Sequence, residues 1–305
     1  MLEVQAQKGV CFFAYNNDQL DYVKMAIVAA RYVKKNLKLP VCLITDEGSE
    51  SWLEESHPKK LIKETFDYII ITNDEMKDNR RRHYDSPWTQ FAAQFSNSNK
   101  HKIFQYSPFE QTLLLDIDYI VKTDTLLKYF DNDYPVCMFD RATTLRNELP
   151  ALQERFLYDA GIKMWWSTVI YFDRSDFSKM FFDGWAHVAE NYDFYQYLYN
   201  FPSKLFRTDY CVSIAIHILA GMQDEQSLIG NFDNTALVNM SQKDDIIEAK
   251  NDNEWIMLSH DQKEVWKNIL VNTSNQDIHV MNKRAFDRVI PDLMETLWIK
   301  KTEDM

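Results

Sequence analysis

The stretch LLLDIDYIV, residues 113–121, holds two aspartates two positions apart in a run that is otherwise nearly all apolar. In an extended segment, side chains at positions i and i+2 point the same way, so Asp116 and Asp118 are expected to face together at a strand end. Like charges repel there, and burial without a partner costs free energy. A divalent cation such as Mg²⁺ or Mn²⁺ would resolve both problems. However, Asp-x-Asp is a common tripeptide, and two solvated aspartates in a loop need no metal.

The sequence before this stretch alternates short apolar runs with amphipathic stretches, which is the rhythm of βαβ units. We expect strands at 10–15, 41–45, 67–72 and 112–115. A helix between the first two would be capped by Asn17 or Asp18 and ended by Pro40. Another helix is expected around 88–95. The predicted fold class is α/β, with a mostly parallel, Rossmann-like central sheet flanked by helices, and ligands bind at the strand ends of such sheets.

The pattern after residue 121 is less regular. Strands are expected at 134–139, 166–172, 255–258 and 278–280, and helices at 175–197, 208–219 and 284–298. The stretch 222–254 is polar, with eight acidic residues against two lysines, and is interpreted as an insertion or mobile excursion.

Composition excludes several classes of protein. Only six glycines occur in 305 residues, and neither GxGxxG nor GxxxxGK[ST] is present, so Rossmann dehydrogenases, P-loop NTPases and protein kinases are poor fits. A net charge of −12 does not steer the chain to nucleic acid or to an anionic membrane. Four cysteines scattered in apolar runs favour a reducing compartment. With no signal-peptide pattern and no apolar run long enough for a membrane span, we expect a cytoplasmic protein.

Several segments, in order along the chain, resemble the GT-A-fold glycosyltransferases of the glycogenin-like and lipopolysaccharide-galactosyltransferase-like type (family 8). LLLDIDYIV is similar to their Asp-x-Asp segment, and IHVMNKRAF at 278–286 is similar to their His-x-x-x-x-Lys segment. Further similar segments are CFFAYNNDQLDY (11–22), VCLITDE (41–47), MWWSTVIYFD (164–173) and RTDYCVSIAI (207–216). The resemblance implies one GT-A domain over 1–305, with a nucleotide-sugar-binding half at 1–121 and an acceptor-side half at 122–305.

The resemblance also implies a metal-dependent transferase that takes a sugar from a nucleoside-diphosphate sugar and retains the anomeric configuration. In this family Asp118 would bind the metal directly, Asp116 would reach the metal or the ribose, and His279 would be the third ligand. Mixed carboxylate and imidazole ligation favours Mn²⁺ over Mg²⁺. Lys283 would meet the diphosphate and stabilise the leaving group. Without the resemblance, a hydrogen-bonded histidine in a short strand is the better interpretation of His279.

Five further residues follow from the family pattern. Tyr15 and Asn16 would contact the nucleotide, although an ordinary turn after a strand explains them equally well. Arg82, one of three adjacent arginines, and Lys102 would touch the donor phosphate. Asp209 would bind the acceptor or approach the anomeric carbon as a catalytic residue, but an aspartate stabilised by a helix dipole explains it equally well.

The acceptor is left open, because Trp166-Ser167-Thr168 stands where the family has Asn-Ser-Gly, and Asp209-Tyr210 stands where it has Asp-Gln. The segment 77–102 is basic. A solvated loop is the commonest explanation of such a charge run, and an anionic acceptor such as DNA is the sharper one. The low glycine content, with abundant Asn, Asp, Lys and Tyr, resembles phage glycosyltransferases, some of which place sugars on hydroxymethylated DNA bases. The residues concerned are Lys77, Arg80, Arg81, Arg82, Lys100 and Lys102, with Tyr84 and Trp88 among them.

Two other classes remain open. A nucleotidyltransferase has a similar sheet and paired acids, but it carries a glycine-rich loop with Arg and Lys after the first strand, where this chain reads AYNNDQLDY. A non-catalytic sugar-nucleotide- or carbohydrate-binding protein that kept the fold is the second alternative.

Overall fold

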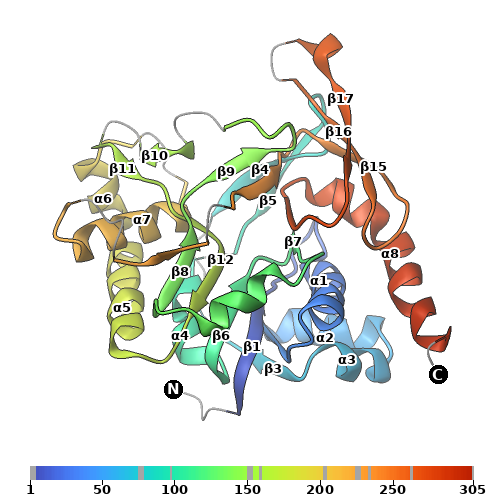
Figure 1. The fold of residues 1–305 in the computed structure, drawn as a ribbon, viewed down its shortest axis with the longest axis horizontal. Coiled ribbons are helices and arrows are strands. Elements are labelled where there is room, and N and C mark those ends of the chain that lie inside the picture. The colour runs from blue at the N-terminus through green and yellow to red at the C-terminus, as the bar shows by residue number, and fades with distance from the viewer. Residues whose placement is uncertain are drawn as a thin grey trace.

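The computed structural model describes residues 5–74, 79–96, 98–149, 154–157, 160–201, 205–223, 228–232, 235–261 and 264–303. A seven-stranded sheet runs through its centre in the order β13-β8-β12-β6-β1-β2-β3 (Figure 1). Every strand is parallel to the others except β12, which is antiparallel to both of its neighbours. The strands are β1 (Ala6–Phe13), β2 (Val41–Thr45), β3 (Tyr68–Ile71), β6 (Phe109–Leu115), β8 (Val136–Phe139), β12 (Trp166–Phe172) and β13 (Gly230–Asn231).

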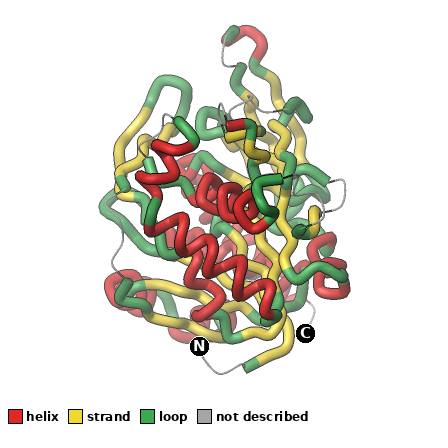
Figure 2. Tube along the Cα trace, turned by 90° about the vertical axis from the view of Figure 1, so that its left-hand side faces the viewer, coloured by secondary structure: helices red, strands yellow, loops and turns green. Residues whose placement is uncertain are grey.

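Helices pack on both sides of this sheet. Figure 1 shows α5 and α7 on one side of the strands and α1 and α8 on the other. Figure 2 views the α5–α7 side, where helices lie in front of the strands. The helices are α1 (Tyr22–Asn36), α2 (Glu47–Ser56), α3 (Lys59–Thr65), α4 (Ile103–Tyr106), α5 (Asp176–Glu190), α6 (Tyr192–Leu198), α7 (Thr208–Leu219) and α8 (Lys283–Glu303), with short 3₁₀ turns η1 (Lys100–Lys102), η2 (Thr125–Asp131) and η5 (Val265–Lys267).

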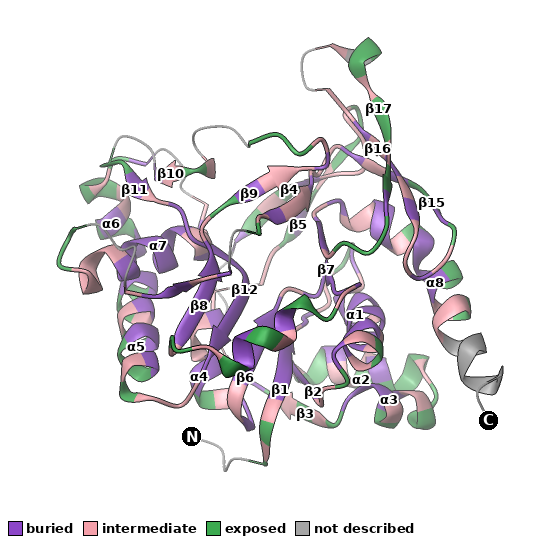
Figure 3. Ribbon diagram, viewed as in Figure 1, coloured by how far each residue is buried: buried purple, intermediate pink, exposed green. Residues whose placement is uncertain are grey.

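The central strands form because their side chains are apolar on both faces, as a sheet covered on both sides requires. All five residues of β2 and all seven of β12 are buried (Figure 3). Strand β1 lies between β2 and β6, with Val10 beside Val41 on one side and Leu113 on the other. This register brings the ends of β1, β2 and β6 to one edge of the sheet, which is where the aspartate pair follows β6.

Smaller sheets lie beside that edge. β7 (Tyr119–Ile120), β18 (Ile278–Val280), β14 (Leu237–Met240) and β9 (Ala142–Thr144) form one sheet in this order. β15 (Asp245–Ala249), β16 (Trp255–Ser259) and β17 (Ile269–Thr273) form another, which projects at the upper right of Figure 1. Two hairpins complete the strands: β4 (Arg80–Tyr84) with β5 (Gln90–Gln94), and β10 (Phe156–Leu157) with β11 (Ile162–Lys163).

The expected α/β class, with a mainly parallel central sheet and flanking helices, is confirmed. The expected helix around 88–95 is wrong: residues 90–94 are strand β5, paired antiparallel with β4. The expected cap of the first helix is also wrong, because Asp21 accepts the Lys24 N–H at its start and Asn17 accepts from Gln19 and Leu20 in the preceding turn.

The polar stretch 222–254 contributes to the framework. Its described residues include β13 in the central sheet, β14 in the second sheet and β15 in the third. Residues 224–227 and 233–234 of this stretch, like Lys77, lie outside the described part of the chain. All four cysteines are buried and unpaired. Among the residues described, no helix combines the length and the apolar character that a membrane crossing requires.

Close packing between β1 and β6 gives a test of this core. Gly9 lies opposite the buried ring of Phe109, and a Cβ on Gly9 would come within 2.4 Å of that ring. Gly9→Ala is expected to lower the free energy of unfolding by about 1–3 kcal/mol, as overpacked cores do. Urea denaturation followed by circular dichroism measures the change. The control is Gly48→Ala in exposed α2, where the new Cβ makes only an ordinary 3.6 Å contact. Equal stability of the Gly9 variant and the wild type would contradict this packing.

Candidate metal and nucleotide-sugar site

The aspartate pair lies in a turn directly after β6. The strand ends at Leu115, and the Tyr119 N–H donates to the Asp116 carbonyl at 2.9 Å, which closes the turn. The extended geometry expected for this tripeptide is therefore wrong, and the turn gathers the two carboxylates instead. The Asp116 N–H donates to the Thr168 carbonyl on β12 at 2.9 Å, which ties the turn to the central sheet. Asp118 is buried, with 3% of its surface exposed.

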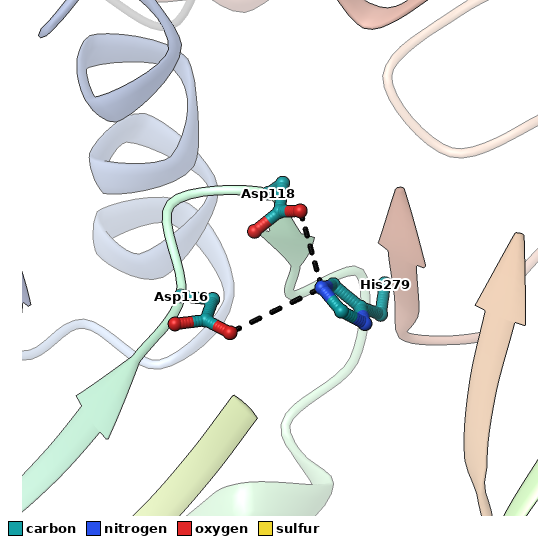
Figure 4. Close-up of side chains that lie close together, drawn as sticks. All are labelled: Asp116, Asp118 and His279. Atoms are coloured by element: carbon teal, nitrogen blue, oxygen red, sulfur yellow. Dashed lines mark ion pairs between the residues drawn. The ribbon is translucent and has the colours of Figure 1, made fainter. Parts of the chain in front are cut away.

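His279 comes from the neighbouring strand β18. The Val280 N–H donates to the Asp118 carbonyl at 2.7 Å, and His279 lies opposite Tyr119 in the register of β18 with β7. The His279 Nε2 atom is 3.1 Å from Asp118 Oδ2 and 4.0 Å from Asp116 Oδ2 (Figure 4). On the far side of the ring, Nδ1 is 2.9 Å from the Asn239 Oδ1 atom on β14. An amide oxygen only accepts, so Nδ1 carries a proton, and Nε2 is the ring atom left to face the carboxylates.

The donor set fits a divalent cation. One ligand atom from each of Asp116, Asp118 and His279 lies within 4.8 Å of the other two. An octahedral ion with bonds of about 2.1 Å separates adjacent donor atoms by about 3 Å and opposite ones by about 4.2 Å. The two distances from Nε2 fall at these values. The structure thus brings together the three residues that the family resemblance implied as metal ligands.

Two lysines neutralise the carboxylates. Lys100 of η1, which is buried, donates to Asp116 Oδ1 and to the Ser167 carbonyl, both at 2.5 Å. Lys283, the first residue of α8, contacts Asp118 Oδ2. Burial disfavours the charged form of Asp118, but the charges of Lys283 and His279 outweigh it and hold the pKa of this carboxyl below its usual range. Burial raises the pKa of Asp116, and Lys100 opposes that rise.

A cavity of about 300 Å³ opens over this cluster. Tyr15, which lines this cavity, accepts a hydrogen bond from Asn99 Nδ2 at 2.8 Å, and its hydroxyl lies 3.3 Å from that of Thr72. Burial raises the pKa of Tyr15 to about 12, so the hydroxyl stays protonated. The Asn99 Oδ1 atom is buried without a partner among the described residues, so it can accept a hydrogen bond from a ligand. Asn16 does not line the cavity, because its side chain accepts the Val23 N–H at the start of α1.

Asp209, in the first turn of α7, also lines the cavity. Its Oδ1 atom accepts hydrogen bonds from the Ser167 N–H at 2.9 Å and from the Ser167 hydroxyl at 2.8 Å. Its Oδ2 atom is 3.3 Å from Arg207. Burial opposes ionisation of this carboxyl, but Arg207 and the bonds from Ser167 hold its pKa below the usual range. Asp209 is thus a fixed negative charge facing the cavity.

Two of the expected donor-phosphate residues lie outside the cavity. Arg82 is exposed on β4, and Lys102 is paired with Asp74. Their near neighbours Arg81 and Lys100 line the cavity instead. In a strand, alternate side chains share a face, so Arg81 and His83 point the same way and Arg82 points the opposite way. Recognising 80–84 as a strand would have identified the arginine that lines the cavity.

Asn239, Arg207 and Tyr22 also lie at the site but carry no local sequence signal. Asn239 reaches His279 from 40 residues away. Tyr22, in the first turn of α1, lines the cavity with a buried hydroxyl that has no partner among the described residues. Contacts of this kind depend on how distant segments meet, which periodicity and spacing do not reveal.

No protein-family model matches the chain, and no curated protein matches it either. Among solved structures, the chain is similar to the glycosyltransferase GlyE of Streptococcus pneumoniae TIGR4, at 12% identity over 75% of this chain and 46% of that one, with a TM-score of 0.43. It is also similar to the galactosyltransferase LgtC in complex with donor and acceptor sugar analogues, at 13% identity over 68% and 70% of the two chains, with a TM-score of 0.42.

A third similar structure is the 4-diphosphocytidyl-2C-methyl-D-erythritol synthase of Anaerococcus prevotii DSM 20548, at 10% identity, 74% and 88% coverage and a TM-score of 0.39. The chain spans less than half of the length of GlyE. At these identities and TM-scores the similarities assign no activity to this chain.

The contact between Asn239 and His279 predicts a measurable effect on metal binding. Asn239→Ala is expected to weaken Mn²⁺ binding about 10–100-fold, because the histidine loses the partner that fixes its tautomer and ring orientation. Electron paramagnetic resonance of free Mn²⁺ during a titration measures the affinity. The control is Asn272→Ala on exposed β17, where the amide contacts only Glu254 among the described residues. Equal Mn²⁺ affinity of the two variants would remove Asn239 and its histidine partner from the metal site.

Proposed function

We propose that the chain is a metal-dependent glycosyltransferase that moves a sugar from a nucleoside-diphosphate sugar to an acceptor hydroxyl. The observation that carries this proposal is the convergence of Asp116, Asp118 and His279 at the carboxyl end of β6, with Lys283 beside them. The order of family-like segments along the sequence agrees with it. The ion would be Mn²⁺ or Mg²⁺, and the mixed ligand set favours Mn²⁺.

The arrangement suits the departure of a diphosphate. Breaking the bond between sugar and phosphate leaves extra negative charge on the nucleoside diphosphate, and a bound divalent cation would supply Lewis-acid stabilisation of that charge. Lys283, like Lys100, adds a positive charge of this chain beside the metal ligands. Tyr15 and Asn99, which also line the cavity, would hold the nucleoside, with the Asn99 Oδ1 atom as a hydrogen-bond acceptor.

Asp209 would face the sugar. A carboxyl whose pKa is held below the usual range is ionised at neutral pH, so it serves as a negative charge or a nucleophile and not as a proton donor. This role agrees with a positively charged transition state at the anomeric carbon. Retention of configuration is part of the proposal and rests on the family resemblance.

One feature argues against a nucleotidyltransferase. Residues 14–21, between β1 and α1, read AYNNDQLD and hold no glycine, arginine or lysine. A triphosphate substrate bound through a glycine-rich basic loop has no counterpart in that segment. The two reactions also give different products: a glycosyltransferase releases a nucleoside diphosphate, and a nucleotidyltransferase releases a diphosphate ion.

The first test of this function is donor hydrolysis. A panel of UDP-, GDP-, ADP-, CDP- and TDP-sugars is incubated with Mn²⁺, and nucleoside diphosphate is measured by chromatography. We expect release from one of these donors that EDTA abolishes and that Asp118→Asn lowers at least about 100-fold, as for loss of a transition-state charge stabiliser. Asp131→Asn, an exposed aspartate paired only with Lys8 among the described residues, is the control. Release that persists in EDTA or in the Asp118 variant would refute the proposal.

The second test separates binding from chemistry at Lys283. Leaving-group charge peaks in the transition state, so Lys283→Ala is expected to lower kcat by about 10²–10³-fold and to change donor affinity much less. Steady-state kinetics and calorimetric titration of the donor give the two numbers. Arg284→Ala, the next residue of α8 with its guanidinium over the Phe91 ring, is the control. A variant whose loss lies wholly in donor affinity would assign Lys283 to ground-state binding alone.

A further inference from the structure

Arg81 is the one cation of the described cavity lining that has no carboxylate of its own. Four cationic side chains and three carboxylates line the cavity. Lys100 pairs with Asp116, and Lys283 pairs with Asp118. Arg207 pairs with Asp209. Among the described residues Arg81 forms no ion pair, so its charge is not neutralised within this part of the protein.

The contacts of Arg81 hold its guanidinium in the cavity without neutralising it. The guanidinium lies over the Phe95 ring, 5.1 Å from the centroid. Once the Gln242 amide is oriented to satisfy its neighbours, its oxygen accepts from Arg81 NH2 at 3.0 Å. Both partners are uncharged. Strand pairing of β4 with β5, with Arg81 opposite Ala93, fixes the side from which the side chain enters.

Arg81 lies within electrostatic range of both Asp118 and Asp209. Burial and then the charge of Arg207 lower the pKa of Arg81, whereas the charges of Asp209 and Asp118 raise it. Glu154 is a further carboxylate in this region, but it makes no ion pair with either arginine in the described structure and does not line the cavity. Two residues from Arg81, His83 is buried, and its Nε2 atom has no partner in the part of the chain that is described. Burial lowers the pKa of this imidazole to about 3. The neutral ring can therefore donate a hydrogen bond to a ligand oxygen.

The charge balance of the proposed reaction does not involve Arg81. The two positive charges of a divalent ion offset the two negative charges of a nucleotide-sugar diphosphate. The remaining carboxylates already have their partners. Arg81 is half-buried, and an arginine without an ion-pair partner prefers a carboxylate or phosphate that accepts two parallel hydrogen bonds.

We propose that Arg81, with His83 beside it, binds an anionic group, a carboxylate or phosphate, carried by one of the two sugars that meet in this cavity. The existence of this anion site stands on the cavity alone. Only the statement that a sugar carries the anion rests on the proposed glycosyltransferase function. Arg80 and Arg82 take no part, because both are exposed on the opposite face of β4.

The site is tested with inorganic phosphate in the presence of EDTA, so that neither metal nor nucleotide is needed. Calorimetric titration is expected to give saturable binding for the wild type and for the matched control Arg82→Gln. Arg81→Gln should bind at least about tenfold more weakly, the loss expected for hydrogen bonds to a charged group. Arg81→Lys keeps the charge without the fork and should lie between these values. Absence of saturable binding by the wild type, or equal binding by wild type and Arg81→Gln with both variants folded by thermal melting, overturns the proposal.

The source of the anion is tested with Mn²⁺ and two donors, UDP-glucose and UDP-glucuronate. Tighter binding of UDP-glucuronate, with the preference lost in Arg81→Gln and kept in Arg82→Gln, assigns the anion to the transferred sugar. Phosphate that still binds to the UDP-glucose complex through Arg81 assigns it to the acceptor. Phosphate displaced by UDP-glucose, whose sugar carries no charge, with no preference between donors, overturns the proposal. A protein that binds phosphate through Arg81 but releases no nucleoside diphosphate would refute the proposed function and leave the anion site standing.

Discussion

The compensation of two like charges at the end of one strand determines how the rest of this molecule is arranged. Asp116 and Asp118 follow β6 in a tight turn, where each carboxylate would destabilise the other if left alone. Lys100, His279 and Lys283 contact these carboxylates and offset the repulsion between them. Two of these come from more than 160 residues further along the chain, so the site exists only when both halves of the chain have folded together.

The second sheet, formed by β7, β18, β14 and β9, positions His279 beside the aspartates. β18 is only three residues long, yet it pairs with β7 directly after the aspartates and with β14 on its other side. The first pairing fixes the height of the histidine against Asp118, and the second brings Asn239 to its far nitrogen. A short strand held on both edges is rigid, and a metal ligand gains affinity from such rigidity. α8 begins three residues later and carries Lys283 to the same carboxylate.

The sequence was informative wherever an element is defined by its own residues. Val41–Thr45, Trp166–Phe172 and Thr208–Leu219 have the bounds expected, since buried runs and helical spacing are local properties. It was misleading at the β4–β5 hairpin. Phe91, Ala93 and Phe95 alternate as in a strand, but Phe91 and Phe95 are also spaced as on a helix. The pairing of Arg81 with Ala93 and the stacking of His83 on Phe91 decide between them, and neither is visible in a short window. The same hairpin determines which arginine enters the cavity.

The cavity is lined by four cationic side chains and by no glycine. Proteins that bind phosphates with backbone N–H groups need glycines where the chain approaches the ligand closely. None of the six glycines here lines the cavity, and Gly9 serves instead to let the Phe109 ring pack against β1. The phosphate recognition proposed for this site would therefore rely on a bound ion and on cationic side chains. A single long side chain can change without moving its neighbours. A cation on β4 is not one of the residues that pair with the carboxylates, so it adds a binding preference without disturbing the proposed metal ligands. Arg81 is such a cation, whereas its neighbour Arg82 is exposed and does not line the cavity.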